Sequence, residues 1–572
     1  MPDGATTTTF VPIDLDASRW ENIEPLAGAL LEREVDGKDA LERWLLDRSE
    51  LDAACAESRA DLYINMTCHT DDEEASGAWT RYLEQTYPKL KTASFQLDTR
   101  QSELMETHPI DPHRFGVLRR ETLADVKLFR EENVPIESEL AKLDQKHDKI
   151  IGAMTVEFEG ETRTLPQMGR FLEMHDRDVR ERAWRTSSER RLRDAEALDA
   201  IFDEMIRKRD TVGRNAGFAN YRDYAFESMH RFDYTPEDCE AFHHAVETHA
   251  VPFVKELRER RAANMSIDRL RPWDTAVDEK GREPLRPFET GQELIEKTRA
   301  LFDRLDPELH QLFASLGDDM GGSFDLESRT GKASGGYQYM RDRSRVPFIF
   351  MNAAGLHRDA ETIIHEAGHA FHSLLCADEP LVYYRHAPIE FAEVAAMSME
   401  LLTMPHWGVL YPDESEANRA RRKQIEGAIA ILPWIATIDA FQHWLYLHPE
   451  HTIEQRTDYW LALNERFGAG LDWTGIEKTL EKQWQRQGHL FGVPFYYIEY
   501  GIAQLGALGI WKRSIEEGSD RALALYKEAL ALGGSRPLPE LFETAGVPFD
   551  FSADRIESLV RVVREELETL PE

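Results

Sequence analysis

Cysteine is scarce in this sequence. The 572 residues include four cysteines, Cys55, Cys68, Cys239 and Cys376, and none of them forms a CxxC pair of the kind that binds a structural metal. A chain of this length with so few cysteines is not a disulfide-stabilised scaffold, so a reducing compartment is the simpler expectation.

Positive charge is also in short supply. The chain has 69 Lys and Arg residues against 105 Asp and Glu residues, which gives a formal net charge of −36. Proteins that bind nucleic acid or anionic membranes need a basic surface, so we expect neither partner. An acidic surface favours solubility and would attract cationic substrates. Nothing in the sequence indicates an oligomeric state.

Long apolar segments are missing too. The longest uncharged apolar stretch, Ala428 to Ile438, contains Pro433 and is too short to span a bilayer. The amino-terminal residues contain neither the basic nor the apolar region of a secretory signal. We therefore expect a soluble, cytoplasmic protein.

Helical periodicity is what the sequence has in abundance. Residues 17–149 have the pattern of several helices, with breaks near residues 36–37 and 109–112, and helices dominate again from residue 359 to the end. Residues 155–165 alternate about a glycine, which predicts a short β-hairpin, and two short strands are expected near Tyr337–Met340 and Pro347–Met351. The pattern predicts a mainly α protein. The secondary-structure content changes near residue 200, so we expect an amino-terminal helical region with a short β-hairpin over 1–200 and a second domain, which carries the motifs described below, over 201–572.

One helical segment carries the pattern His365-Glu366-x-x-His369. Histidines four apart lie about 40° apart around a helix and one turn apart along it, so both rings can face one ion. Glu366 lies about 100° from His365, where it can reach a water on the metal instead of binding the metal itself. Zinc takes three protein ligands in such sites and leaves a fourth position for water. The metal lowers the pKa of that water, and a carboxylate then removes its proton.

A third ligand is needed to complete this site. The segment that follows, rich in Ala and Met, carries Glu393, which lies 28 residues after His365. A carboxylate on an apolar helix face must be paired or bound to a metal, because burying it alone is costly. Glu390 and Glu400 meet the same description, so the pattern alone leaves all three carboxylates open.

Three separated motifs resemble the thimet oligopeptidase and oligoendopeptidase F family of zinc metallopeptidases, most of all its oligoendopeptidase F branch. The family carries HExGHxxH, which corresponds here to residues 365–372, and its third ligand is the Glu of an F-x-E segment about 28 residues downstream, which falls on Glu393. A His followed by a Tyr-rich segment corresponds to His489 and residues 496–500. Segments at 132–140, 150–156 and 217–224 are also similar to the branch, so the resemblance runs from about residue 115 to 550.

The resemblance implies a two-lobed helical protein with a deep substrate channel and one zinc ion on its floor. It implies that His365, His369 and Glu393 bind the zinc, and that Glu366 is the catalytic base. It also implies that His489, Tyr497 and Tyr500 grip the substrate and the oxyanion, with Tyr496 as the alternative to Tyr497. Tyr497 and Tyr500 are three apart, so their hydroxyls share a helix face.

Three more residues near the motif have expected supporting roles. Glu361 and Glu400 are candidates to hydrogen-bond the ligating histidines. His372 is expected to pack nearby or to support the ligands, since three ligands already suffice. The resulting prediction is an endopeptidase that cleaves internal bonds of short peptides through a zinc-bound water that Glu366 activates. Two alternatives stay open: a zinc carboxypeptidase or dipeptidyl carboxypeptidase on the same scaffold, and a non-catalytic peptide-binding protein.

Overall fold

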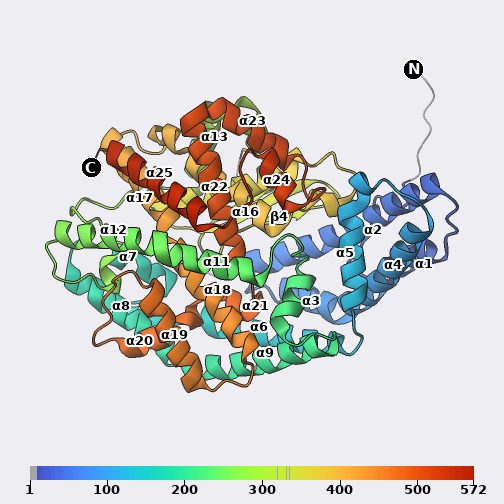
Figure 1. Cartoon of the computed structure of the whole chain (residues 1–572), viewed down its shortest axis with the longest axis horizontal. Coiled ribbons are helices and arrows are strands. Elements are labelled where there is room, and N and C mark those ends of the chain that lie inside the picture. Colours follow the sequence, from blue (N-terminus) through green and yellow to red (C-terminus); the bar gives the residue numbers. More distant parts are fainter. Residues whose placement is uncertain (1–8, 319, 330, 334, 572) are drawn as a thin grey trace. The chain divides into compact units, whose positions relative to one another are not determined.

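The structure is a computed structural model that describes residues 9–318, 320–329, 331–333 and 335–571, with the side chains at 145 and 148 left out. Helices make up most of it and the strands are few and short, which confirms the predicted mainly α class (Figure 1). The chain forms two compact units, each assembled from three separate segments. This division differs from the predicted one, because residue 200 falls inside α9 (Ala195–Asn215).

The first unit comprises Met1–Phe129, Pro287–Tyr411 and Arg513–Phe549. Its α-helices are α1 (Trp20–Glu32), α2 (Lys38–Cys68), α3 (Glu73–Arg81), α4 (Tyr87–Thr107), α5 (Pro112–Leu128), α13 (Gly291–Leu305), α14 (Pro307–Ala314), α15 (His357–Leu375), α16 (Ile389–Leu402), α23 (Ser519–Leu530) and α24 (Leu538–Thr544). Helices α1, α2, α4 and α5 pack against one another around a buried core that includes Trp44 (Figure 1). The predicted breaks in this region are confirmed, since α1 and α2 are separated at residues 33–37 and α4 and α5 at residues 108–111.

A three-stranded sheet in the first unit supports the helix that carries the His-Glu motif. The strands β3 (Phe324–Glu327), β4 (Tyr337–Arg341) and β5 (Val346–Ala353) lie in the order β3-β5-β4, with β4 antiparallel to β5 and β3 parallel to it. The central strand β5 is buried along most of its length, as its apolar sequence requires, and α15 packs on it. The strands predicted near Tyr337–Met340 and Pro347–Met351 are therefore confirmed.

The second unit comprises Arg130–Arg286, Pro412–Lys512 and Asp550–Glu572. Its α-helices are α6 (Asn133–Gly152), α7 (Gly169–Leu172), α8 (Arg177–Leu192), α9, α10 (Tyr221–Ser228), α11 (Pro236–Ala245), α12 (Val251–Asn264), α17 (Glu414–Ala430), α18 (Leu432–Leu447), α19 (Ile453–Phe467), α20 (Glu477–Glu481), α21 (His489–Gly492), α22 (Tyr497–Glu517, whose last residues count with the first unit) and α25 (Ala553–Thr569). The strands β1 (Thr155–Phe158) and β2 (Glu161–Thr164) form the predicted antiparallel hairpin.

Short 3-10 and π turns connect these helices. They are η1 (Tyr82–Thr86), η2 (Pro166–Met168), η3 (Val246–Ala250), η4 (Pro272–Asp274), η5 (Val382–Arg385), η6 (Met404–Val409) and η7 (Gln483–Arg486). Local sequence explains where several helices begin. Thr235 caps α11 in a capping box with Asp238, and Pro236 occupies the first helical position, where its missing N–H is not needed.

One stretch, Glu414–Leu447, is long and apolar enough to cross a membrane by length and composition alone. It includes α17 and α18 and is longer than the uncharged apolar stretch from Ala428 to Ile438. Inside the protein, 72% of its most apolar window is buried, as in a core helix, so it is weak evidence for a membrane span.

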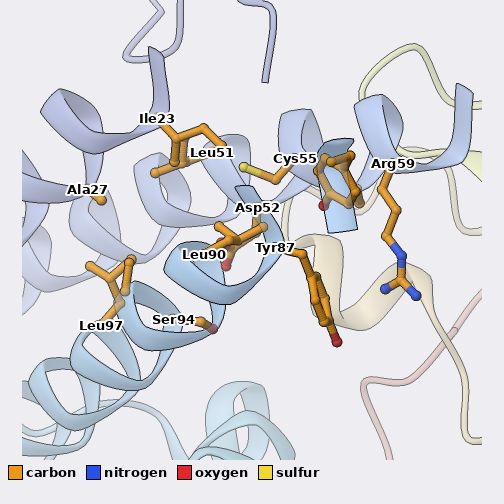
Figure 2. A pocket seen from close by; sticks show the side chains of 13 residues that line it. Ile23, Ala27, Leu51, Asp52, Cys55, Arg59, Tyr87, Leu90, Ser94 and Leu97 are labelled. Carbon is orange, nitrogen blue, oxygen red and sulfur yellow. The ribbon is translucent and has the colours of Figure 1, made fainter. Parts of the chain in front are cut away.

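A pocket lies among α1, α2 and the start of α4, where apolar side chains such as Ile23, Leu51 and Leu90 surround Asp52 and Cys55 (Figure 2). None of its lining residues belongs to α15 or α16. The pocket is therefore not part of the histidine cluster described next.

Candidate metal centre

The helix α15 presents the His-Glu motif from a firmly anchored start. The carboxylate of Asp359 accepts hydrogen bonds from the backbone N–H groups of Ala354 (2.7 Å) and Leu356 (2.9 Å), which satisfies two donors just before and at the helix start. Apolar residues of α15 such as Ile363, Ile364 and Ala367 are buried, while its two motif histidines remain partly exposed.

A glycine lets α15 and α16 approach very closely. A Cβ atom on Gly368 would lie 2.5 Å from the Cα atom of Ala396 and 2.7 Å from the carbonyl oxygen of Ala395, both on α16. Only glycine fits such a contact between helix backbones. The crossing at Gly368 therefore determines how near α16 comes to His365 and His369.

This crossing brings Glu393 to both histidines. The carboxylate oxygen Oε2 of Glu393 lies 3.4 Å from Nε2 of His365 and 3.9 Å from Nε2 of His369. One donor atom from each of the three residues lies within 4.8 Å of the others. The two histidine side chains are about one fifth exposed, whereas that of Glu393 is buried. The structure thus places together the three residues that the resemblance implies.

The other candidate carboxylates of the site have different positions. Oε1 of Glu400 lies 2.7 Å from Nδ1 of His365, the ring nitrogen that faces away from Glu393. Such a contact is typical of the carboxylate that orients a metal-binding histidine. Glu361, the other candidate for that role, instead contacts Nε2 of His357 at 2.9 Å. Glu390 is buried on α16 and is not among the three residues whose donors converge.

The surroundings affect the two histidines in opposite ways. Burial lowers the pKa of His369 to about 4, which keeps its imidazole neutral, the form that binds metals. Burial also acts against the charged form of His365, but hydrogen bonds with Glu393 and Glu400 outweigh it and raise that pKa well above its usual value.

Glu366 is held close to the same cluster without contributing to the converging set. Its side chain is buried, and burial raises its pKa to about 7, helped by the charge of Glu393 and opposed by His365. The backbone N–H of Gln338, on the edge strand β4, donates a hydrogen bond to this carboxylate. A carboxyl group with a pKa near neutrality suits proton transfer in both directions.

The aromatic residues implied by the resemblance belong to the second unit. Nε2 of His489, on α21, lies 3.3 Å from the hydroxyl of Tyr500, and its ring centre lies 5.2–5.7 Å from those of Tyr496, Tyr497 and Tyr500. Tyr497 is buried, and burial raises its pKa to about 12. Tyr496 and Tyr500 are half-buried. The structure therefore brings His489 and the tyrosines together as one cluster of their own.

A family model decides the relationship of the chain to known proteins. The model for peptidase family M3 matches residues 170–560, more than half of the chain. The chain belongs to peptidase family M3. The match includes α15, α16 and the segment from His489 to Tyr500.

Two relatives that carry peptidase names agree with this assignment. The chain is 24% identical over 253 residues to oligopeptidase PepF of Bacillus subtilis (strain 168), a stretch that covers 43% of this chain and 37% of that protein. It is 25% identical over 256 residues to an oligoendopeptidase F homolog of Borreliella burgdorferi, covering 43% and 42%. These matches span less than half of the length of either relative.

Solved structures match over nearly the whole chain. Pz peptidase A, solved with an inhibitor, is 27% identical with a TM-score of 0.89 and coverage of 96% of this chain and 97% of that one. A protein provisionally named oligoendopeptidase F is 26% identical, with a TM-score of 0.90 and coverage of 98% and 99%. The structural similarity therefore extends to residues that precede the family-model match, which begins at residue 170.

The donor set of the M3 cluster fits a divalent metal. Two imidazole nitrogens and one carboxylate oxygen converge, both histidines keep some exposure, and the second nitrogen of His365 is fixed by Glu400. Two histidines and one glutamate are the protein ligands found in some catalytic zinc sites. His372 is not one of the converging residues; it is buried against the ring of Phe391.

Sequence reasoning missed one contact of this site. A backbone N–H of Gln338 donates this hydrogen bond to Glu366, so no side-chain motif predicts it. Gly336 is the sequence signal for this close approach of the strand to Glu366. A Cβ atom on Gly336 would lie 3.4 Å from the carbonyl oxygen of Phe350 and 3.8 Å from Oε1 of Glu366.

Proposed function

We propose that this M3 family member is a zinc-dependent endopeptidase that cleaves internal peptide bonds of short oligopeptides. The observation that carries the proposal is the convergence of His365, His369 and Glu393 beside a buried carboxylate, Glu366. Membership of peptidase family M3 and the similarity to proteins named oligopeptidase and oligoendopeptidase support peptides as substrates. A cytoplasmic location is part of the proposal, and the substrate channel that the resemblance implies stays a prediction.

In this proposal His365, His369 and Glu393 hold one zinc ion. When bound, zinc acts as a Lewis acid that makes water a nucleophile near neutral pH and polarises the scissile carbonyl. Glu366 removes a proton from the attacking water and then passes it to the leaving amine. Burial supports this exchange because it brings the pKa of Glu366 to about 7. Glu400 holds His365 through Nδ1, so that Nε2 stays turned towards Glu393.

His489, Tyr497 and Tyr500 are proposed to donate hydrogen bonds to the substrate and to the oxyanion formed from its carbonyl. Tyr496 is kept as the alternative to Tyr497, because it is half-buried where Tyr497 is buried. Losing one oxyanion donor costs about 2.7–4 kcal/mol of barrier. Tyr500→Phe is therefore expected to lower kcat far more than it changes KM. An unchanged kcat would return Tyr500 to an ordinary packing role.

The experiment that tests the proposal is a quenched-fluorescent peptide assay on the purified chain. Activity should disappear on chelation and return when zinc is added, with cleavage at internal bonds. Substrates with a blocked carboxyl terminus should be cut as well as free ones, whereas a requirement for a free terminus would favour a carboxypeptidase. No cleavage of a diverse peptide library by the zinc-loaded protein would favour a peptide-binding role and refute the proposed activity.

A further inference from the structure

A second group of metal-binding side chains lies inside the second unit, on α11 and α18. Each helix contributes a pair of residues four apart: Cys239 and His243 on α11, and Asp439 and His443 on α18. Residues four apart lie on one face of a helix, and these two helices pack against each other. The four side chains therefore meet between the helices, and they belong to none of the motifs that define the M3 site.

The contacts within this cluster centre on Asp439. Its Oδ2 atom accepts a hydrogen bond from Nε2 of His243 at 2.8 Å. Nε2 of His443 lies 3.3 Å from the same oxygen, but this contact lacks hydrogen-bond geometry. One donor atom each of Cys239, Asp439 and His443 lies within 4.8 Å of the others. A small rotation of these side chains would let all three contact one ion.

The cluster is sealed from solvent. The side chain of Asp439 is 0% exposed and those of His243 and His443 are 6% exposed, and Cys239 is also buried. The rings of Phe226 and Phe495 pack against His443. A charged carboxylate in such surroundings is costly unless a cation or several donors compensate it.

The protein groups alone leave part of this requirement unmet. Oδ1 of Asp439 and Nε2 of His443, the ring nitrogen that faces Asp439, are buried and have no hydrogen-bond partner among the described residues. A proton on one histidine would offset the charge of Asp439, but in the described geometry it would leave Oδ1 of Asp439 without a donor. A divalent cation bound by a thiolate, a carboxylate and neutral imidazoles would give the cluster zero net charge.

We propose that Cys239, Asp439 and His443 bind a second zinc ion, with His243 completing the site next to Asp439. Sulfur, imidazole and carboxylate donors in one cluster suit zinc, which is four-coordinate in structural sites. Because all four side chains are buried, a zinc held here would be structural. It would tie α11 to α18 within the second unit.

Zinc analysis of the full-length chain tests this inference. The wild-type protein should hold two zinc ions per chain after dialysis against metal-free buffer. Glu393→Gln, which alters only the proposed catalytic site, should hold one, and Cys239→Ser should also hold one. Cys376→Ser is the matched control, because Cys376 is buried but lies outside both donor clusters, and it should keep both ions. A Glu393→Gln protein that binds no zinc would overturn the proposal.

Cobalt provides a second readout that does not depend on activity. Glu393→Gln loaded with Co²⁺ should show the near-ultraviolet charge-transfer absorption of a cobalt–thiolate bond, and Cys239→Ser in the same background should lose it. Chelation should lower the thermal unfolding midpoint of Glu393→Gln but not that of the double variant. A cobalt spectrum of Glu393→Gln without thiolate absorption would contradict the proposed ligands. One zinc per wild-type chain that survives Glu393→Gln but not Cys239→Ser would support this site and refute the catalytic one.

Discussion

The two histidine clusters of this chain share one local geometry but differ in their exposure to solvent. In each cluster, two side chains four residues apart on one helix lie next to a carboxylate on another helix. In the first, His365 and His369 of α15 lie next to Glu393 of α16. In the second, Cys239 and His243 of α11 lie next to Asp439 and His443 of α18. The histidines of the first cluster are about 20% exposed, whereas the second cluster is sealed. Open ligand positions are typical of catalytic metal sites, and closed ones of structural sites.

The surroundings differ as much as the exposure does. The first cluster has a buried carboxyl group, Glu366, whose pKa of about 7 suits proton transfer, and a backbone donor from β4 beside it. The second cluster has apolar rings around its donors and contains a thiol. Spacing of ligands on a helix therefore indicates that a metal can bind, while exposure and the neighbouring acid–base group indicate what the metal can do.

The largest expected effect is the loss of metal from the open cluster alone. Glu393→Gln should remove zinc and activity there, because it replaces a charged ligand with a neutral amide. The loss in metal affinity should exceed the ~10–100-fold typical of changes to groups that only support a ligand. Glu390→Gln is the matched control, since Glu390 is also a buried carboxylate of α16, and it should keep the zinc content. Zinc measured by elemental analysis decides between them, and loss in Glu390→Gln instead would exchange the two assignments.

Removing the acid–base group should separate chemistry from metal binding. Glu366→Gln is expected to lower kcat by about 10²–10⁴-fold, the usual contribution of a general acid–base catalyst. Its zinc content should equal that of the wild type, because Glu366 is not among the converging donors. Cys239→Ser, in the sealed cluster, should leave kcat unchanged at a temperature where the variant is folded. Steady-state kinetics beside metal analysis would measure both, and zinc loss in Glu366→Gln would show that the base and ligand roles are confused.

A smaller effect is expected from the carboxylate behind His365. Glu400→Gln removes the charge 2.7 Å from Nδ1 of His365 but keeps a hydrogen-bond acceptor. We expect zinc affinity at the open cluster to fall by about 10–100-fold, with kcat of the fully loaded enzyme changed less. A competition assay with a chromophoric chelator would report the affinity. Unchanged affinity would mean that the packing of α15 and α16 alone orients His365.

Much of the open cluster could be predicted from the sequence, because its signals are local. The spacing of His365 and His369 specifies one helix face, and the breaks and the hairpin over residues 155–165 follow from turn residues. The choice of Glu393 over Glu390 and Glu400 needed the family resemblance, since all three are carboxylates on one apolar helix and only the crossing of two helices distinguishes them.

The sealed cluster could not be predicted in the same way. The two residues of each pair are four apart, which is a recognisable helical spacing. The pairs themselves are 196 residues apart, from His243 to Asp439, and neither segment contains a pattern that predicts contact with the other. The division of the chain also depends on long-range packing. Each compact unit combines three distant segments, so a boundary inferred along the chain, such as residue 200, does not describe it.

The smallest expected effect concerns the contact that creates the open cluster. Gly368→Ala would place a Cβ atom 2.5 Å from the Cα atom of Ala396, so α15 and α16 must move apart. Overpacking of this kind costs about 1–3 kcal/mol of stability. The same movement would draw Glu393 away from the histidines and weaken zinc binding, whereas zinc in the sealed cluster should be retained.

Gly116→Ala in α5, where a Cβ atom meets nothing within 4 Å, is the control and should be neutral or stabilising by about 0.5–1 kcal/mol. Denaturant unfolding together with zinc analysis would measure both quantities. Unchanged stability and zinc content in Gly368→Ala would mean that the helix crossing tolerates more separation than its geometry indicates.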